Sequence, residues 1–422
     1  MLAKVRPYGH GLKTYFAAFA KGFPAHKMKV VGITGTKGKT STTVLTGRLL
    51  NLMGTKTGYI STASIFLGKG EEILNPFKMT TIDGAKMNSY LRQMVKNGCK
   101  CVIIEMSSQG LEQNRHFGLG GFDIGVFLNL FPEHIEAHGS FENYKNMKGK
   151  LFENIKRNGV VIGPEDFKES LEMFAKVPVD IKNTVTEILL QEGRDYFVRD
   201  DKNSIFKYLR MGENEVKTNF SADFEMTNLA FAVKIAEAVS GKNEGLALVT
   251  AKELKGIPGR MELVVKSKKF DIMVDYAHEP ESMRRLLTTL SGWKGEGIYD
   301  NIIHIVSCDG VGRDDWKKPL LGDISVNYSD FSVVTTDNYE PHDNPQMIVD
   351  ILSQNFDPKE NDIKYVKVIN RLEGFKIALE WAKSVGGKSI IVSTGVGVEH
   401  GLTQPSGTME WDEREVWKGL VK

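Results

Sequence analysis

The stretch "VVGITGTKGKTSTT" occupies residues 30–43 and joins an apolar, strand-like run to a glycine-rich turn. Lys39 and Thr40 stand where a helix would follow the turn, so backbone N–H groups and the helix N-terminus can surround phosphate oxygens. In that arrangement Lys39 neutralises the β- and γ-phosphates, and the hydroxyl of Thr40 holds magnesium. The strict G-x-x-x-x-G-K-T spacing is not met, because Ile33 lies five residues before Gly38. We therefore predict a phosphate loop with a solvent-facing Lys39, the alternative being an ordinary strand-to-helix turn.

Strand-like and helix-like stretches alternate along the rest of the chain. The helix-length stretches carry apolar residues at three- and four-residue spacing. This alternation is typical of α/β layers with largely parallel sheets. Glycine and proline interrupt it in "KGIPGRMELV", residues 255–264, where we expect a domain boundary. The apolar runs expected to be strands are residues 29–34, 101–106, 123–129, 302–307 and 389–394.

The charge balance gives no reason to expect nucleic acid or an anionic membrane as a partner. Among 422 residues, 55 are Lys or Arg and 53 are Asp or Glu, so the net charge is only +2. Three cysteines are too few for a disulfide framework, and no signal peptide or long apolar span is present, so we expect a reducing cytoplasm. The run "LKTYFAAFAKGF", residues 12–23, is a helix candidate that we expect to pack on the first domain rather than contact a membrane.

Polar residues that follow other strand-like runs are candidate ligands for a cation. Glu105 ends the apolar run of "CVIIEMSSQGLEQNR", and ligands bind at the carboxyl ends of strands in open parallel sheets. Its carboxylate suits magnesium, although a surface residue at a strand end is an equal alternative. His134 and His138 are four residues apart, but the H-E-x-x-H pattern is not met and the nearby cysteines lack a second ligand pair. We therefore expect no structural zinc site.

A series of motifs, in this order and spacing, resembles the Mur ligases of the UDP-N-acetylmuramoyl-tripeptide synthetase branch. The resemblance extends from residue 29 to the end of the chain. It implies a P-loop-type central ATPase domain with a parallel sheet and a Rossmann-like C-terminal domain. We expect an N-terminal helical segment at residues 1–27, the ATP domain at 28–258 and the amino-acid-binding domain at 259–422. The motifs are "GTKGKTS", "MTT" at 79–81, "EMSSQGLEQNR", "NLFPEHIEAHGSFENYKNMKGKLF", "PGRME", "DYAHEPESM" and "RDDWKKPLLG".

The resemblance implies sites for ATP and Mg²⁺, with Lys39, His134 and Lys148 as catalytic residues. Where the family has N-x-x-N beside the adenine, this sequence departs from it and reads Glu225-Met-Thr-Asn228. The magnesium ligands implied are Thr40, Glu105, His134 and Lys148. The ATP-binding positions implied are Gly35, Thr36, Gly38, Lys39, Thr40, Asn228, Arg260, Asp275 and His278, the last with a structural role as the alternative.

Lys148 lies in "YKNMKGKLF", where the family has a carbamylated lysine in Y-x-x-A-K-x-x-L-F, with Met147 in place of the alanine. Addition of carbon dioxide to the amine gives a carbamate. The positively charged side chain of Lys148 then becomes an anionic oxygen ligand, which is suited to a second magnesium ion. Without the resemblance, Lys148 would be interpreted as a solvated surface lysine.

The implied reaction is ATP-driven amide formation in peptidoglycan precursor synthesis. A substrate carboxylate attacks the γ-phosphate to give an acyl phosphate, and the amine of an amino acid then displaces phosphate. Both steps develop negative charge on oxygen, which cations and backbone donors stabilise. The positions that match contacts to a UDP-muramoyl-peptide are Thr80, Thr81, Ser107 and Arg115.

The run "TTDNYEPHDNP", residues 335–345, matches the loop that reads D-N-P-R in family members that add meso-diaminopimelate, whose arginine grips the distal carboxylate. Here Tyr339 and Glu340 fill the last two positions, and the family's G-K-G-H-E reads Gly395-Val-Gly-Val-Glu399. We expect a basic or neutral amino acid, lysine first, since an acidic residue repels a distal carboxylate. The alternative is that Glu340 points to solvent. The positions assigned to this amino acid are Arg313, Asp337, Asn338, Glu340 and Glu399.

Two alternatives stay open from the sequence. Only a short helical segment precedes the phosphate loop, where the family normally carries a uridine-binding domain, so folylpolyglutamate synthetases, which share the two-domain plan without it, are the second interpretation. Their loop typically continues G-K-G-S, whereas this one reads G-K-T-S. A catalytically silent nucleotide-binding partner of a cell-wall complex is the third, and the presence of the expected ATP and magnesium residues argues against it. The sequence does not indicate the oligomeric state.

Overall fold

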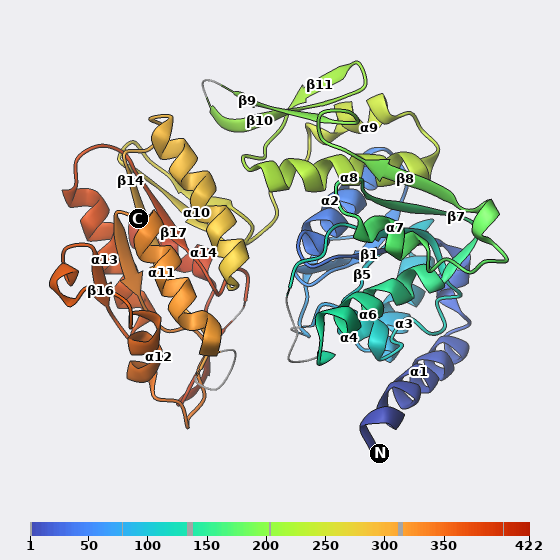
Figure 1. The fold of residues 1–422 in the computed structure, drawn as a ribbon, viewed down its shortest axis with the longest axis horizontal. Coiled ribbons are helices and arrows are strands. Elements are labelled where there is room, and N and C mark those ends of the chain that lie inside the picture. The colour runs from blue at the N-terminus through green and yellow to red at the C-terminus, as the bar shows by residue number, and fades with distance from the viewer. Residues whose placement is uncertain (1, 78, 133–137, 202–203, 311–314, 400) are drawn as a thin grey trace. The chain divides into compact units, whose positions relative to one another are not determined.

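The apolar runs expected to be strands are strands in the computed structural model, which describes residues 2–77, 79–132, 138–201, 204–310, 315–399 and 401–422. The chain divides into two units, Met1–Lys255 and Gly256–Lys422, each built around its own sheet (Figure 1). The division lies between Lys255 and Gly256, where glycine and proline interrupt the alternation. The α/β class with largely parallel sheets is confirmed.

The sheet of unit 1 has the strand order β4-β3-β2-β5-β1-β6-β7-β8. Strand β1 lies inside it, parallel to β5 on one side and to β6 on the other, so the carboxyl ends of these three strands meet at one edge. Within the described part of this sheet, only β3 runs opposite to the other strands, and it pairs antiparallel with β2 on one side and β4 on the other. The strands are β1 Lys29–Thr34, β2 Thr57–Ile60, β3 Ser64–Phe66, β4 Ile73–Leu74, β5 Cys101–Glu105, β6 Phe122–Phe127, β7 Ile155–Pro164 and β8 Thr186–Leu190.

Helices cover both faces of this sheet. On one face α2 packs against β2 and β5 and against α8, which lies over it (Figure 1). On the other face α3, α6 and α7 bury their apolar side chains against alternate strand residues. The helices of unit 1 are α1 Leu2–Ala20, α2 Lys39–Leu52, α3 Gly84–Lys96, α4 Ser108–Glu112, α6 Phe141–Glu153, α7 Glu169–Phe174, α8 Asp223–Ser240 and α9 Glu244–Ala251.

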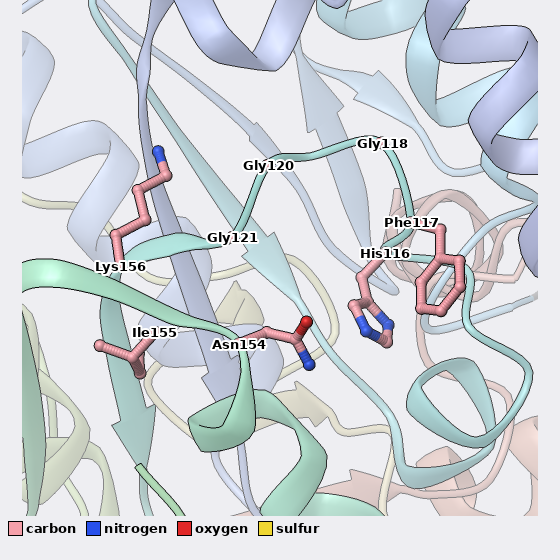
Figure 2. A pocket seen from close by; sticks show the side chains of 8 residues that line it. All are labelled: His116, Phe117, Gly118, Gly120, Gly121, Asn154, Ile155 and Lys156. Atoms are coloured by element: carbon pink, nitrogen blue, oxygen red, sulfur yellow. The ribbon is translucent and has the colours of Figure 1, made fainter. Parts of the chain in front are cut away.

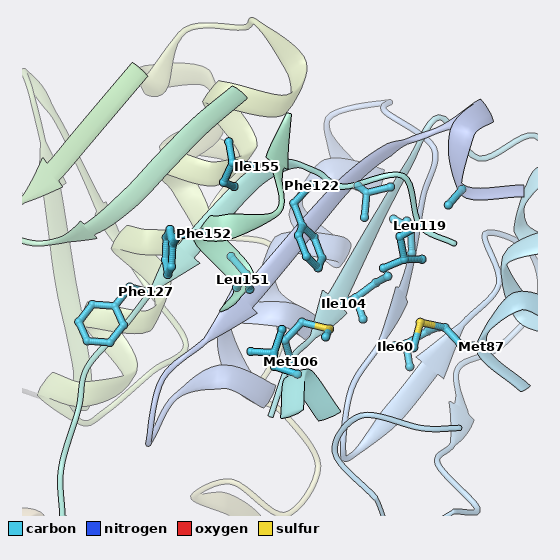
Figure 3. Packing of buried hydrophobic residues seen from close by; sticks show 14 of the residues in the cluster. Ile60, Met87, Ile104, Met106, Leu119, Phe122, Phe127, Leu151, Phe152 and Ile155 are labelled. Atoms are coloured by element: carbon cyan, nitrogen blue, oxygen red, sulfur yellow. The ribbon is translucent and has the colours of Figure 1, made fainter. Parts of the chain in front are cut away.

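The core beneath α3 and α6 fixes the spacing between these helices and the sheet. Phe122 of β6 and Leu151 of α6 pack over Gly32 of β1, where an added Cβ atom would lie 2.7 Å from the Phe122 ring. Figure 3 shows Phe122, Leu151, Phe152 and Ile104 gathered on this face. Because protein interiors are close-packed, α6 is held at one height over β1. This places residue 148, near the middle of α6, close to the end of β1.

Unit 1 also carries an antiparallel sheet of order β11-β10-β9 and the expected N-terminal helix. Helix α1 packs against α3, as expected for a helix on the first domain. Across the described parts of the chain, no helix combines the length and the apolar character needed to cross a bilayer. The antiparallel strands are β9 Phe197–Asp201, β10 Ser204–Met211 and β11 Asn214–Lys217.

Unit 2 is a second sheet with helices on both faces, of order β12-β13-β17-β14-β15-β16. Strands β13 to β17 run parallel, and β12 pairs antiparallel at the edge. Its strands are β12 Glu262–Lys266, β13 Phe270–Val274, β14 Asn301–Val306, β15 Phe331–Val334, β16 Tyr365–Lys367 and β17 Ser389–Ser393, with the hairpin β18 Leu402–Gln404 and β19 Gly407–Met409. Its helices are α10 Pro280–Gly295, α11 Lys318–Tyr328, α12 Pro345–Leu352, α13 Arg371–Ser384 and α14 Glu413–Val421.

Candidate active site

The turn between β1 and α2 has the geometry of a phosphate loop. Gly38 precedes the first residue of α2 with a φ of 82°, a conformation that favours glycine. An added Cβ atom there would lie 2.3 Å from Oδ1 of Asn228 on α8, so the turn and α8 approach each other closely. Asn228 also accepts a hydrogen bond from Oγ1 of Thr42 at 3.3 Å, which joins α8 to α2.

The loop backbone is held by a side chain that follows β6. Oδ1 of Asn129 accepts the N–H groups of Thr36 at 3.0 Å and Lys37 at 2.8 Å. Lys39 is half-buried, and its Nζ donates to the carbonyl of Thr36 at 2.9 Å. Lys39 is thus only partly exposed to solvent, because its side chain folds back over the loop that it follows.

Glu105 lies at the carboxyl end of β5 and is buried, with 1% of its surface exposed. Its two oxygens each accept from Oγ1 of Thr40 at 3.0 Å, and Oε2 also accepts the N–H of Thr62 at 2.7 Å and its Oγ1 at 3.0 Å. The alternative of a surface residue at a strand end is wrong. Thr40 and Glu105 together present carboxylate and hydroxyl oxygens, the donor type that Mg²⁺ prefers, so these residues fit that ion.

Lys148 comes from α6 and is buried, with 1% of its surface exposed. Its Nζ donates to the carbonyl of Gly35 at 2.7 Å and lies 4.3 Å from the centre of the Tyr144 ring. The Tyr144 hydroxyl shares a hydrogen bond with Oγ1 of Thr36 at 3.0 Å. Lys148 is thus not a solvated surface lysine, and it points at the phosphate loop.

His134 and His138 lie in the segment between β6 and α6. His134 lies outside the described residues. His138 is described, and its Nε2 lies 3.0 Å from Oγ of Ser108 while Nδ1 lies 3.6 Å from Glu112. Burial lowers the pKa of His138, although the charge of Glu112 opposes this. Through Ser108, the ring forms a hydrogen-bonded contact between α4 and the segment before α6. Among the described residues, no group of three or more His, Cys, Asp or Glu side chains gathers in a way that could hold a metal.

The residues expected to hold the muramoyl-peptide lie next to Glu105. Oγ1 of Thr81 donates to the carbonyl of Glu105 at 3.0 Å and accepts the N–H of Ser107 at 2.8 Å. The hydroxyl oxygens of Thr62 and Thr80 lie 3.1 Å apart, within hydrogen-bond distance. The half-buried Arg115 donates to the carbonyl of Thr81 and to Gln113, and burial lowers its pKa while Asp83 raises it. Thr80, Thr81, Ser107 and Arg115 therefore belong to one hydrogen-bonded network beside the Thr40 and Glu105 pair, in which Thr81 is buried.

Three further expected ATP-binding residues lie in unit 2, whereas Asn228 lies in unit 1. Asp275 follows β13 and is buried, and it accepts the N–H groups of Met261 and Ala277, each at 2.7 Å. Burial raises the pKa of Asp275, while the charge of Arg260 lowers it. The Arg260 guanidinium lies 4.8 Å from the centre of the Tyr276 ring. His278 is exposed, and its Nδ1 lies 2.8 Å from the carbonyl of Tyr276.

Residues expected to bind the amino acid meet where β15 and β17 end in unit 2. Nδ2 of Asn338 donates to Oε2 of Glu399 at 3.2 Å, and the hydroxyl of Tyr276 donates to Oε1 of Glu399 at 3.0 Å. Asn338 also accepts the N–H of Thr403 at 2.8 Å, which fixes the loop against β18. Arg313 lies outside the described residues. The structure thus brings Asn338 and Glu399 together with Tyr276 of the "DYAH" motif.

Glu340 lies on the same loop and is half-buried. Its backbone N–H donates to Oδ2 of Asp343 at 2.7 Å, so the loop turns tightly there. No hydrogen-bond donor of the described chain contacts the Glu340 carboxylate. Its neighbour Tyr339 is buried, and the backbone N–H of Tyr339 donates to the carbonyl of Thr403 at 3.0 Å.

Comparison with known proteins agrees with this arrangement. The model of the Mur ligase middle domain matches residues 33–236, and that of the Mur ligase glutamate ligase domain matches residues 259–397. A UDP-N-acetylmuramoyl-L-alanyl-D-glutamate--2,6-diaminopimelate ligase of Clostridium perfringens is 30% identical over 411 residues, which are 94% of this chain and 78% of that protein. The chain belongs to the Mur ligase family. Mur ligases are ATP-dependent enzymes that form amide bonds in peptidoglycan biosynthesis.

Other relatives and solved structures support the same family and fold. The corresponding diaminopimelate ligase of Geobacillus kaustophilus is 28% identical over 416 residues, covering 95% of this chain and 80% of that protein. The solved structure of a UDP-N-acetylmuramoyl-L-alanyl-D-glutamate--2,6-diaminopimelate ligase has a TM-score of 0.61 at 23% identity, covering 94% and 79%. A folylpolyglutamate synthase of Mycobacterium tuberculosis, complexed with ADP and AMPPCP, has a TM-score of 0.68 at 13% identity, covering 91% and 92%. At these identities the solved structures show the fold that this Mur ligase shares with them.

Three residues of the candidate site were assigned no role from the sequence, although Asn129 and Tyr144 lie within the motif that begins at residue 129. Thr62 donates twice to Glu105, Asn129 holds the phosphate loop, and Tyr144 lies between that loop and Lys148. Asn129 lies just after β6, and ligands bind at the carboxyl ends of strands in a parallel sheet. Its place in the sequence could therefore have marked it as a candidate site residue. Thr62 lies in a short turn between β2 and β3, and no sequence pattern marked it as a site residue.

A cavity of about 330 Å³ lies elsewhere in unit 1, between the loop before β6 and the start of β7. Figure 2 shows the rings of His116 and Phe117 on one side and Lys156 on the other. Burial lowers the pKa of His116 to about 4, so the ring is neutral at physiological pH. Because this loop precedes β6 while the phosphate loop follows β1, the cavity lies at the opposite edge of the sheet and outside the candidate active site.

Asp337 is a buried carboxylate beside a buried ion pair. Arg371 and Glu413 form that pair, with Nη2 and Oε1 at 2.8 Å, and Arg371 also donates to Ser307 at 2.8 Å. Ser307 in turn donates to Oδ2 of Asp337 at 3.4 Å. Burial raises the pKa of Asp337 to about 7; Arg371 opposes this, and the charges of Asp309 and Glu399 add to it.

The raised pKa of Asp337 predicts that unit 2 loses stability as pH rises from about 4, the ordinary carboxyl value, to about 7. In that window the folded state binds a proton that the unfolded state has released, and each unit of pKa difference is worth about 1.4 kcal/mol. Asp337→Asn should remove this part of the pH dependence. All five tryptophans lie in unit 2, so denaturant unfolding followed by tryptophan fluorescence at several pH values measures it. Equal pH dependence in the wild type and the variant would contradict the assignment.

Proposed function

We propose that this Mur ligase joins an amino acid to the carboxylate of a UDP-N-acetylmuramoyl-peptide, using ATP and magnesium, in the cytoplasm. The observation that carries the proposal is the hydrogen-bonded network of Thr81, Ser107 and Arg115 beside Thr40 and Glu105. It puts a site for an anionic acceptor next to a phosphate loop. The relatives described above are named for ligases of this kind.

Phosphate binding and acceptor binding are the tasks of unit 1. Lys39 and the N–H groups of the loop offset the charge of the γ-phosphate, and Arg115 holds a carboxylate or phosphate group of the acceptor. Thr40, Glu105 and His134 are the residues that would hold magnesium, which when bound would supply positive charge at the transferring phosphoryl group. The acceptor carboxylate attacks that group to form an acyl phosphate, and the amino group of the incoming amino acid then displaces phosphate to form the amide.

Lys148 has a further part in this proposal as a carbamate. Its buried Nζ lies 2.7 Å from the Gly35 carbonyl, so the modified side chain would bring an anionic oxygen to the phosphate loop. Tyr144, whose ring lies beside Nζ, keeps the α6 side of this position free of bulk water. The carbamate is thereby a candidate oxygen ligand for a second magnesium ion.

Arg260, Asp275 and His278 of unit 2 are assigned to the nucleotide, together with Asn228 of unit 1. Asp275 accepts two backbone N–H groups and so keeps its position whether or not a ribose hydroxyl donates to it. Arg260 supplies a positive charge for phosphate. His278 is the exposed member of this set, and its ring is held at the carbonyl of Tyr276.

The amino acid is proposed to be lysine or another basic or neutral residue rather than diaminopimelate. The loop of Asp337, Asn338 and Glu340 would bind its side chain together with Glu399, and Arg313 would bind its α-carboxylate. Glu340 and Glu399 are both acidic and half-buried. A second carboxylate on the incoming amino acid meets repulsion there, whereas a distal amine is attracted.

A screen of acceptors tests the proposed reaction. The purified chain with ATP, magnesium and lysine should release phosphate and form a product only with a UDP-N-acetylmuramoyl-peptide, and product mass should rise by one lysine less one water. The same mixture with a folate and glutamate serves as the comparison, because folylpolyglutamate synthases share the fold. A product with the folate alone would overturn the muramoyl-peptide proposal in favour of that second reaction.

A competition between equal amounts of lysine and meso-diaminopimelate tests the amino-acid pocket. Lysine should be incorporated at least roughly fivefold more often, because one repulsive pair of charges costs about 1 kcal/mol or more. Glu340→Gln should reduce this preference, and Glu340→Arg should turn it toward diaminopimelate. Product mass gives the ratio in each case.

Two results would contradict the proposed amino-acid preference without contradicting the proposed ligase reaction. One is predominant incorporation of diaminopimelate by the wild type. The other is a ratio that stays the same in all three proteins, which would mean that Glu340 points to solvent and does not meet the amino acid.

A further inference from the structure

Helix α1 directs its small side chains toward unit 1 and its large apolar side chains away from it. Gly11, Thr14 and Ala18 are buried at the contact with α3 and the loop before β6. On the opposite side lie the residues that we name the outer face of α1. These are Leu12, Tyr15, Phe16 and Phe19, with 58%, 47%, 60% and 67% of their surfaces exposed.

Close packing fixes this orientation of the helix. An added Cβ atom on Gly84 of α3 would lie 2.1 Å from Oγ1 of Thr14, and one on Gly118 would lie 2.5 Å from the Cβ atom of Ala18. On the helix itself, an added Cβ atom on Gly11 would lie 2.9 Å from the ring of Phe117. Rotation of α1 to bury its aromatic rings would therefore replace small side chains with large ones where no space exists.

The outer face belongs to a segment that is entirely basic in its charged residues. Residues 1–27 contain no Asp or Glu, and the first acidic residue of the chain is Glu71. The side chain of Lys13 is 64% exposed, and its Nζ lies 3.4 Å from Oδ2 of Asp83, whose side chain is 34% exposed. The aromatic rings form one cluster with Phe23, whose ring centre lies 5.4 Å from that of Tyr15 and 6.1 Å from that of Phe19. The basic residues of the segment are Lys4, Arg6, Lys13, Lys21 and Lys27.

We propose that the outer face of α1 binds the surface of an anionic lipid bilayer. A helix with aromatic and leucine side chains on one face and lysines beside them lies in the plane of the interface, with its apolar face at the acyl boundary. The lysines then meet the negatively charged headgroups. Charge decides between this partner and a second copy of the chain, because pairing two outer faces would bring together two segments whose charged residues are all basic. Docking of α1 on α3 and binding to lipid use different faces, so both hold at once.

Sedimentation with lipid vesicles tests the proposal on the full chain. The protein should bind vesicles of phosphatidylcholine with phosphatidylglycerol, bind vesicles of phosphatidylcholine alone much less, and be released by added salt. The double variant Phe16→Ser with Phe19→Ser should bind about tenfold or more weakly, because it removes two side chains that enter the apolar layer. Lys21→Glu with Lys27→Glu should weaken binding to the anionic vesicles only.

A matched control uses exposed apolar residues elsewhere in unit 1. Leu171 is 58% exposed and Val179 is 89% exposed, and Leu171→Ser with Val179→Ser should bind vesicles like the wild type. Thermal unfolding and ligase activity without vesicles should be unchanged in every variant, since these residues lie outside the candidate active site. Equal binding by the control and the Phe16 and Phe19 variant, or no binding to anionic vesicles at all, would overturn the proposal. Dimers in sedimentation velocity that the Phe16 and Phe19 substitutions dissociate would assign the outer face to a second copy instead.

Discussion

The hydrogen bond from Lys148 to the carbonyl of Gly35 is the interaction on which the arrangement of the candidate site depends. A lysine with 1% of its surface exposed has lost its hydration, and burial of an ammonium group is costly unless acceptors replace the water. The Gly35 carbonyl and the ring of Tyr144 do this from two directions. Because Tyr144 also bonds to Thr36, the start of the phosphate loop and α6 are held by the same two side chains. The core beneath α6 keeps this helix at the height that the contact requires.

The second unit is organised around a different buried charge. Arg371 and Glu413 have 1% and 0% of their side-chain surfaces exposed, and loss of either partner would leave an uncompensated charge that costs about 3 to 5 kcal/mol. The Arg371 guanidinium also bonds to Ser307 after β14 and to the carbonyl of Thr394 after β17. These two bonds hold the ends of the neighbouring strands β14 and β17, and the turn before Glu399 begins at the end of β17. Ser307 in turn donates to Asp337, on the loop that follows β15. The loops proposed to bind the amino acid thus depend on a buried ion pair.

The strands and the phosphate loop followed from the sequence because both leave local signals. Apolar runs with glycine-rich turns predict β1 and the start of α2 without knowledge of the tertiary fold. The burial of Lys148 could not be predicted in this way, since one lysine on an amphipathic helix is normally solvated, and only the distance between α6 and β1 makes it buried. The path of Lys39 back to Thr36 and the two bonds from Thr62 to Glu105 likewise depend on contacts across the sheet edge. The exposed aromatic face of α1 was missed because apolar residues at helical spacing indicate a buried face.

The central claim is that Lys148 is buried for chemistry at the phosphate loop rather than for packing alone. Carbon-13 NMR of the protein in labelled bicarbonate tests it most directly, combined with ligase activity before and after bicarbonate is removed. The account predicts a carbamate signal that is absent in Lys148→Ala and retained in Lys150→Ala, a lysine of the same helix, with activity that falls on bicarbonate removal and returns on its addition. Full activity in Lys148→Ala, or a wild type without this signal whose activity does not change when bicarbonate is removed, would contradict the account.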